Sequence, residues 1–391
     1  MSALKTALEP GEEVQAATRT RSVLRMDWLL LLAAIGLVGC SVLTLHSAVR
    51  NNSLAERQAI YAGMGLIAVL ILSRVDYSRL REYKLGLFGV MVVLNVVVYG
   101  MPPIQNAHRW IPLKLMQFQS SEFGKVLLIV ALSAFAVDRA RRLEERRTTA
   151  RIMLLALVAA MLVIPQPDLG TGMVYVSIGV AVLFFAGTPF KHLTALIVLF
   201  VAALVFGLVV GPALGVHPLS HYQEQRLFGF LNPSSDPQGA TYNIHQSLIA
   251  IGSGEKTGRG IYATQTTQGF LSANSTDFVF ASVGETYGFV GAAVLLSLYA
   301  LLIWRTLRIL TTAKNLFGTL IAGGILAMFM FQIFVNVGMT IGIMPITGVP
   351  LPLMSYGGSS VIVTFLAIGL LQSIHVQARI ASSGKTRALL S

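Results

Sequence analysis

Long apolar segments alternate with short polar ones along most of the chain. Most of these segments hold roughly 18 residues or more, enough for a helix to cross a ~30 Å hydrocarbon core. The pattern predicts an all-α, polytopic membrane protein with about ten transmembrane helices. We place these helices at 27–48, 57–74, 83–100, 121–138, 151–165, 171–188, 192–211, 277–304, 315–343 and 357–378.

The composition agrees with this pattern. Hydrophobic residues make up 54% of the chain and charged residues only 12%, whereas a soluble globular domain is roughly 25% charged. The single cysteine, Cys40, falls within the first apolar segment, so no intramolecular disulfide is expected. That segment follows a polar tail and has no small-residue cleavage site, so we expect a retained helix rather than a signal peptide.

The basic residues are distributed unevenly between the two sides of the predicted bundle. Most of the 29 lysines and arginines fall in the tails and connections that share a side with both termini. The positive-inside rule therefore predicts cytoplasmic termini. Nucleic-acid binding, the alternative explanation for a net charge of +12, is not expected because the basic clusters lack interleaved aromatic residues.

The predicted organisation has three parts. A basic cytoplasmic tail at 1–26 precedes a ten-helix transmembrane domain at 27–378, and a cytoplasmic tail follows at 379–391. Within the domain, the extracytoplasmic loop 212–276 is much longer than an ordinary connector, so we expect it to be functional. Its segment 242–251 mixes apolar and polar residues, as is typical of a helix on the membrane surface.

Asp277 stands where this long loop meets the eighth predicted helix. A carboxylate at the membrane boundary could act as a general base. The competing interpretation is an N-cap, since Asp is favoured at helix starts. Glu285 lies on the same predicted helix, roughly 12 Å deeper along its axis, where a carboxylate requires a partner or a proton.

Three other charged positions are candidates because charges in a bilayer are costly. Glu122 and Lys125 are spaced i, i+3, so they could form an ion pair or organise a polar cavity. Asp168 could share that cavity, or it could form a turn in the sequence Pro-Asp-Leu-Gly.

Two arginines on the predicted outer side are candidates for binding phosphate. Arg109 precedes Trp110, so the pair could hold an anion or anchor the chain at the headgroup level. Arg226, in the long loop, is a similar candidate. The seven histidines do not cluster at metal-ligand spacing and no Asp-x-Asp pair occurs, so the sequence indicates no tightly bound metal.

The C-terminal third of the chain resembles the signature of the SEDS family (RodA, FtsW and SpoVE). The resemblance is carried by Asn-Val-Gly-Met at 336–339, by Pro-Ile-Thr-Gly-Val-Pro-Leu-Pro at 345–352 and by Ser-Tyr-Gly-Gly-Ser-Ser at 355–360. Similar matches run in order along the chain at 109–110, 119–125, 166–170, 222–226, 246–247, 276–278 and 284–285. The sequence at 336–339 and 345–348 is more like that of RodA, the elongation member, than that of FtsW, the division member.

This resemblance implies ten transmembrane helices in the bacterial cytoplasmic membrane, lipid II as substrate and polymerisation into β-1,4-linked glycan on the outer face. It implies a class B penicillin-binding protein and the elongation proteins MreC, MreD, MreB and RodZ as partners. No cofactor is evident, although a divalent cation, Mg²⁺ or Mn²⁺, could accompany the diphosphate. The alternatives are a flippase for lipid-linked precursors and a division-type, FtsW-like polymerase.

On this basis we predict that Asp277 is the catalytic base, accepting the proton of the acceptor sugar's C4 hydroxyl. The predicted substrate-binding or cavity-organising residues are Arg109, Glu122, Lys125, Asp168, Arg226, Glu285 and Ser355. The chain departs from the family pattern just before Asp277, where the family commonly has Pro-Glu-x-His and this chain has Ser-Ala-Asn-Ser at 272–275. These changes keep Asp277 but alter its surroundings.

Overall fold

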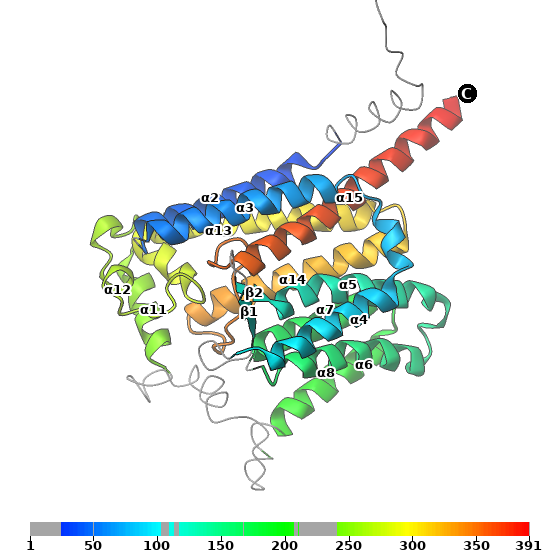
Figure 1. The fold of residues 1–391 in the computed structure, drawn as a ribbon, viewed down its shortest axis with the longest axis horizontal. Coiled ribbons are helices and arrows are strands. Elements are labelled where there is room, and N and C mark those ends of the chain that lie inside the picture. The colour runs from blue at the N-terminus through cyan, green and yellow to red at the C-terminus, as the bar shows by residue number, and fades with distance from the viewer. Residues whose placement is uncertain are drawn as a thin grey trace, which may run out of the picture.

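The structure, a computed structural model, is a bundle of long helices (Figure 1). It describes residues 25–49, 51–102, 109–112, 117–166, 168–206, 210 and 241–390. Its long helices are α2 (Trp28–Ser47), α3 (Asn52–Leu72), α4 (Lys84–Val97), α5 (Ser120–Asp138), α6 (Arg146–Val163), α7 (Leu169–Phe185), α8 (Phe190–Val205), α13 (Val279–Thr312), α14 (Leu316–Thr340) and α15 (Gly358–Leu390). Each overlaps one of the predicted spans, which confirms the polytopic helical fold.

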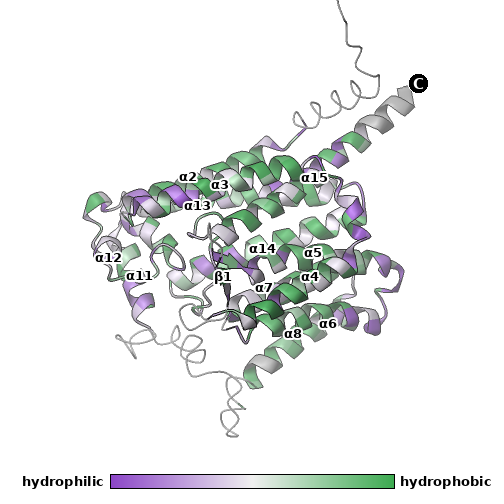
Figure 2. Cartoon of the chain, viewed as in Figure 1, coloured by the Kyte–Doolittle hydropathy of each residue, from purple (hydrophilic) through white to green (hydrophobic). Residues whose placement is uncertain are grey.

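The lengths of these helices match a membrane location. Within the described residues, six helices are long and apolar enough to cross a bilayer: α2, α3, α5, α13, α14 and most of α15. Helices α4, α7 and α8 are shorter but apolar. Figure 2 shows hydrophobic residues along the middle of the bundle and hydrophilic residues at its two ends, as a bilayer crossing requires.

The remaining elements are short. They are the 3₁₀ turns η1 (Tyr77–Arg81), η2 (Val98–Gly100), η3 (Ala140–Arg142) and η5 (Gly260–Tyr262), the strands β1 (Trp110–Pro112) and β2 (Gln117–Gln119), and the helices α11 (Tyr242–Ser253) and α12 (Thr264–Thr267). The strands pair antiparallel, with Trp110 opposite Gln119. Helix α11 confirms the helix predicted at 242–251.

The last helix is longer than the predicted span. It continues to Leu390 and so includes most of the tail expected at 379–391. The segment contains no proline, although it includes Ser382, Ser383 and Gly384, which favour helix less than Ala or Leu.

The helices form two groups joined by α14. Helices α2, α3, α13 and α15 pack on one side, α4 to α8 on the other, and α14 contacts α13, α5 and α7 between them (Figure 1). Helix α15 packs most extensively against α3, and Gly65 permits this approach because a side chain at that position would overlap Phe365. Helices α11 and α12 lie at the end of the bundle opposite the C-terminus.

A buried ion pair ties three helices together at the other end. Asp27, the N-cap of α2, receives hydrogen bonds from Nε (2.9 Å) and Nη2 (2.5 Å) of Arg305 on α13. Gln372 on α15 exchanges two hydrogen bonds of 2.8 Å with the Asp27 backbone. Because the two charged side chains are only 1% and 10% exposed, each neutralises a charge that would otherwise be buried alone.

We expect Arg305→Ala to lower the free energy of unfolding by roughly 3–5 kcal/mol, because the change leaves the Asp27 carboxylate buried without its partner. Arg308→Ala is the matched control, since Arg308 is exposed on the same helix, and its effect should stay within about 0.5 kcal/mol. Denaturant unfolding of the two variants in detergent measures the difference. Equal stability of both would contradict a structural role for the pair.

Candidate active site

The segment that carries Asp277 is fastened by its backbone to α14 and to the segment before α15. The three carbonyl oxygens of residues 275–277 accept hydrogen bonds, in order, from the backbone N–H of Tyr356 (2.8 Å), the hydroxyl of Ser355 (2.7 Å) and the side-chain amide of Asn336 (3.0 Å). A segment with every carbonyl bonded in this way is held in one position. Ser355, predicted as a site residue, therefore supports the backbone next to Asp277.

The same donors also organise the extended segment between α14 and α15. The Asn336 amide donates a second hydrogen bond to the Val349 carbonyl (2.8 Å), and the Ser355 hydroxyl accepts one from the Leu351 N–H (2.8 Å). Non-helical backbone at membrane depth is tolerated only when such partners satisfy it. The C-terminal signature thus forms the frame on which residue 277 rests.

Asp277 is half-buried at the entrance to α13. The N-cap of α13 is Phe278, one residue later, and its side chain makes no capping hydrogen bond. The turn before it is unusual because Ala273 has a left-handed φ of 55°, and the Ala273 carbonyl accepts hydrogen bonds from the N–H groups of Thr276 and Phe278, both 3.1 Å.

Asp168 forms a second polar cluster at the start of α7. Its Oδ1 accepts a hydrogen bond from the Thr171 N–H (3.2 Å), which makes it the N-cap of α7. Its Oδ2 accepts from Gln119 Nε2 and from Ser121 Oγ, both at 3.1 Å. Asp168 therefore shapes the local turn and also joins α7 to the first turn of α5.

This cluster is connected to the frame around Asp277. The Ser359 hydroxyl, on the first turn of α15, donates to the Gln117 carbonyl (3.0 Å) and accepts from the Gln119 N–H (2.9 Å). Gln119, in turn, bonds Asp168. Strand β2 thus links the two polar clusters. It contacts the Asp168 cluster through Gln119, and it contacts the first turn of α15, which begins just after Ser355 and Tyr356.

Glu122 and Lys125 form the expected ion pair on α5. The distance from Lys125 Nζ to Glu122 Oε1 is 2.6 Å, and the side chains are only 1% and 2% exposed. Between them lies Gly124, where any side chain would overlap the hydroxyl of Tyr175. That hydroxyl donates to the Ser121 carbonyl (2.9 Å). The pair is therefore enclosed within the bundle.

Arg109 lies against Trp110. Its guanidinium carbon lies 5.1 Å from the centre of the Trp110 ring, and its buried Nε has no hydrogen-bond partner among the residues that the structure describes. An orphaned donor on a charged group costs free energy unless a ligand satisfies it. Arg226, the other predicted phosphate ligand, lies outside the described residues.

Glu285 is placed apart from these clusters. It is fully buried on α13 and accepts hydrogen bonds from the N–H groups of Gln265 and Thr266, both 2.9 Å, and from the Thr266 hydroxyl (2.6 Å). The expectation that a buried carboxylate there needs a partner is confirmed. The partner is α12, in the loop before Asp277.

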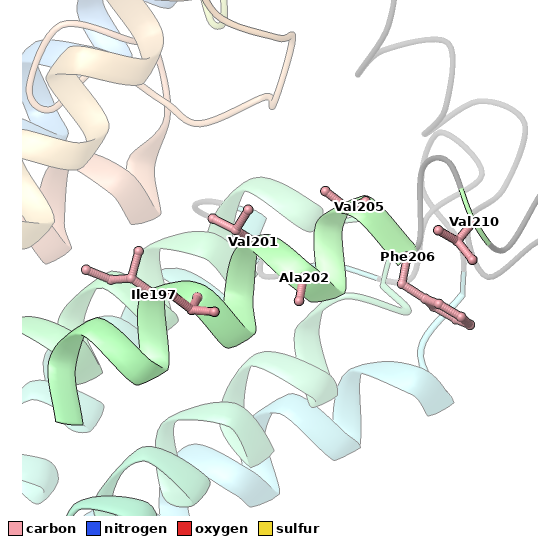
Figure 3. A pocket seen from close by; sticks show the side chains of 7 residues that line it. Ile197, Val201, Ala202, Val205, Phe206 and Val210 are labelled. Carbon is pink, nitrogen blue, oxygen red and sulfur yellow. The ribbon is translucent and has the colours of Figure 1, made fainter. Parts of the chain in front are cut away.

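The hollows that stand out on the described structure do not contain these residues. One lies beside α8 and is lined by apolar side chains such as Ile197, Val201 and Phe206 (Figure 3). Another follows α13 from Phe289 to Leu301 and is also almost entirely apolar. Both hollows are therefore separate from the polar clusters described above.

No group of three or more His, Cys, Asp or Glu side chains converges within the described ranges.

Several residues of the clusters did not stand out individually in the sequence. Asn336, Gln119, Ser121 and Ser359 each connect helices that are distant in the chain. The sequence could indicate that these residues form hydrogen bonds, because uncharged polar residues at the ends of apolar helices need internal hydrogen-bond partners. The sequence could not identify those partners, because they depend on how the helices pack.

Comparison with known proteins places the chain in a family. Residues 22–380 match the family model FtsW/RodA/SpoVE, described as "Cell cycle protein". The chain is 36% identical to the peptidoglycan glycosyltransferase MrdB of Escherichia coli K12, over 91% of this chain and 95% of that protein. It is 33% identical to the peptidoglycan glycosyltransferase RodA of Treponema pallidum, over 92% and 99%.

Solved structures agree with these sequence matches. The rod shape determining protein RodA of Thermus thermophilus has a TM-score of 0.64 and 30% identity, covering 90% of this chain and 96% of that one. A chain from a structure described as the coordination of polymerization and crosslinking by a peptidoglycan synthase complex has a TM-score of 0.75 and 31% identity, over 90% and 98%. This chain belongs to the FtsW/RodA/SpoVE (SEDS) family of multi-pass bacterial membrane proteins.

Proposed function

We propose that this protein is a peptidoglycan glycosyltransferase that polymerises lipid II into β-1,4-linked glycan during cell elongation. The observation that carries the proposal is the fastening of residues 275–277 by Ser355, Tyr356 and Asn336. Such a frame supplies the fixed orientation that a catalytic carboxylate needs. The names of the relatives, MrdB and RodA, favour the same reaction and the elongation role.

In the proposed reaction, Asp277 is the general base. The C4 hydroxyl of the acceptor sugar attacks the anomeric carbon of the growing glycan, and its proton passes to the Asp277 carboxylate. The bond from the anomeric carbon to the polyprenyl diphosphate breaks as the new glycosidic bond forms. A single displacement of this kind inverts the anomeric centre.

The leaving diphosphate needs stabilisation of its negative charge rather than a general acid. Arg109 is the best placed described candidate, because its buried Nε has no partner within the described part of the chain. Arg226 is proposed for the same task. Lys125 is enclosed with Glu122, so we assign this pair and Asp168 to organising the cavity. Any Mg²⁺ or Mn²⁺ would arrive with the diphosphate as part of the substrate.

We propose that the reaction takes place on the outer face of the cytoplasmic membrane, with both termini inside. The turns that follow α3, α5 and α13 carry many of the basic residues and lie at the end of the bundle where α15 terminates. Helices α11 and α12 and the start of α13 lie at the opposite end. The positive-inside rule therefore favours an outer location for Asp277.

A class B penicillin-binding protein is the proposed partner that crosslinks the glycan. The complex that resembles this chain coordinates polymerization and crosslinking, and a coupled partner for this chain is the corresponding proposal. The proteins MreC, MreD, MreB and RodZ are proposed as the wider elongation machinery.

Asp277→Asn should abolish polymerisation of labelled lipid II by the purified protein, because an amide cannot accept the proton. Folding should be unchanged, since the substitution keeps the shape of the side chain and the backbone bonds of residues 275–277. Glycan products separated on gels, with and without the penicillin-binding partner, measure the effect. The matched control is Glu144→Gln, an exposed acid in the turn between α5 and α6, which should polymerise lipid II like wild type.

Two outcomes would contradict the proposal. Retained turnover by Asp277→Asn would remove this residue as the base. Movement of lipid II across vesicle membranes by the wild-type protein, without any glycan product, would favour a flippase.

Two variants can distinguish a role of the Glu122–Lys125 pair in polymerisation from a role in charge neutralisation alone. Glu122→Gln alone should destabilise the protein, because it leaves the Lys125 ammonium enclosed without a counter-charge. The double variant Glu122→Gln/Lys125→Met should recover thermal stability yet polymerise lipid II at least about tenfold more slowly, if the pair organises the cavity. Full activity of the stable double variant would show that the pair only balances charge.

A further inference from the structure

We propose that Glu285 is a positioning residue whose carboxylate, acting through α12 and Asn274, sets the conformation of the segment that carries Asp277. The inference rests on the proposed function, because it concerns the orientation of the proposed base. It also gives Glu285 a different role from substrate binding.

The first link joins Glu285 to α12. Both carboxylate oxygens are used: Oε1 accepts from the Gln265 N–H, and Oε2 accepts from the N–H and the hydroxyl of Thr266. The N–H groups in the first turn of a helix have no partner within that helix, so an external acceptor is needed. Since all three groups are donors, the site fits a carboxylate and does not fit an amide.

The second link joins α12 to the catalytic segment. The Thr266 carbonyl accepts a hydrogen bond from the side-chain amide of Asn274 (2.9 Å). The Asn274 carbonyl accepts one from the hydroxyl of Ser282 (3.0 Å), on the first turn of α13. Thr266 thus contacts both Glu285 and Asn274. Asn274 lies only three residues before Asp277.

The contact between α13 and the loop at 255–258 is rigid. Helix α13 is broken at Gly288, where φ is 63° and ψ is −159°. The N–H groups of Phe289 and Val290 instead donate to the carbonyls of Glu255 (2.9 Å) and Lys256 (3.1 Å). A side chain at Gly258 or at Gly288 would overlap the crossing backbone. The loop is therefore locked to α13 beside Glu285, so α12 cannot shift without losing the carboxylate bonds.

The arrangement also holds the turn before Asp277. Residues 272–275 in this turn are Ser-Ala-Asn-Ser. Ala273 adopts a left-handed conformation that is unfavourable for a residue with a Cβ. A strained turn persists only when its surroundings over-determine it. In this protein the bond from Asn274 to Thr266, anchored by Glu285, supplies part of that constraint.

Glu285→Gln and Asn274→Ala test the link with lipid II polymerisation by the full-length protein in its complex with the penicillin-binding partner. We expect kcat to fall by roughly 10- to 100-fold in each variant, because a misplacement of about 1 Å at a reacting group costs this much. The polymerisation rate is divided by the concentration of lipid II-binding sites, so that a smaller amount of folded protein does not lower the kcat. The KM should stay within about twofold. Gln268→Ala, an exposed change at the end of α12, is the control and should match wild type.

The double variant Glu285→Gln/Asn274→Ala should be no slower than the worse single variant, because both changes break one chain of contacts. Multiplied losses in the double variant would overturn the proposal. So would wild-type kcat in the single variants. If Glu285→Gln does not fold, Asn274→Ala decides alone, since it removes one side-chain bond from a half-buried position.

The outcomes separate this inference from the proposed base. Loss of turnover in Asp277→Asn with wild-type kcat in Glu285→Gln and Asn274→Ala overturns the positioning role alone. Turnover retained in Asp277→Asn but lost in the other two variants removes Asp277 as the base, while the segment remains one that Glu285 holds.

Discussion

The structure depends on hydrogen bonds to the backbone N–H and C=O groups of its non-helical segments. Between α14 and α15, and just before α13, the chain is not helical, so its backbone N–H and C=O groups need other hydrogen-bond partners. Asn336, Ser355 and the Tyr356 N–H supply them to residues 275–277. The two non-helical segments thereby become one rigid unit, and Asp277 belongs to it.

Buried charges in the bundle are satisfied in two ways. Asp27 with Arg305, and Glu122 with Lys125, are enclosed pairs in which each charge neutralises the other. Such pairs fix the packing of helices, because separating them would leave a charge in a low-dielectric interior. Asp168 and Glu285, in contrast, are buried carboxylates that accept hydrogen bonds from uncharged donors.

The fold could be predicted from the sequence to a large extent because hydrophobic length is a local property. Each predicted span contains or overlaps a helix, and the pair Glu122–Lys125 followed from i, i+3 spacing. Partners across helices could not be predicted, since nothing local indicates that Glu285 meets Thr266. Helix α15 extends past the predicted span, because the tail past 378 remains helical although it is no longer apolar.

The most direct test of the account is a structure of the protein with its partner and two bound lipid-linked substrates or close analogues. The account predicts an acceptor C4 oxygen within about 2.6–3.2 Å of a carboxylate oxygen of Asp277, with the diphosphate at Arg109. An acceptor sugar whose C4 hydroxyl lies beside another carboxylate, such as Glu122 or Asp168, and out of reach of Asp277 would contradict it.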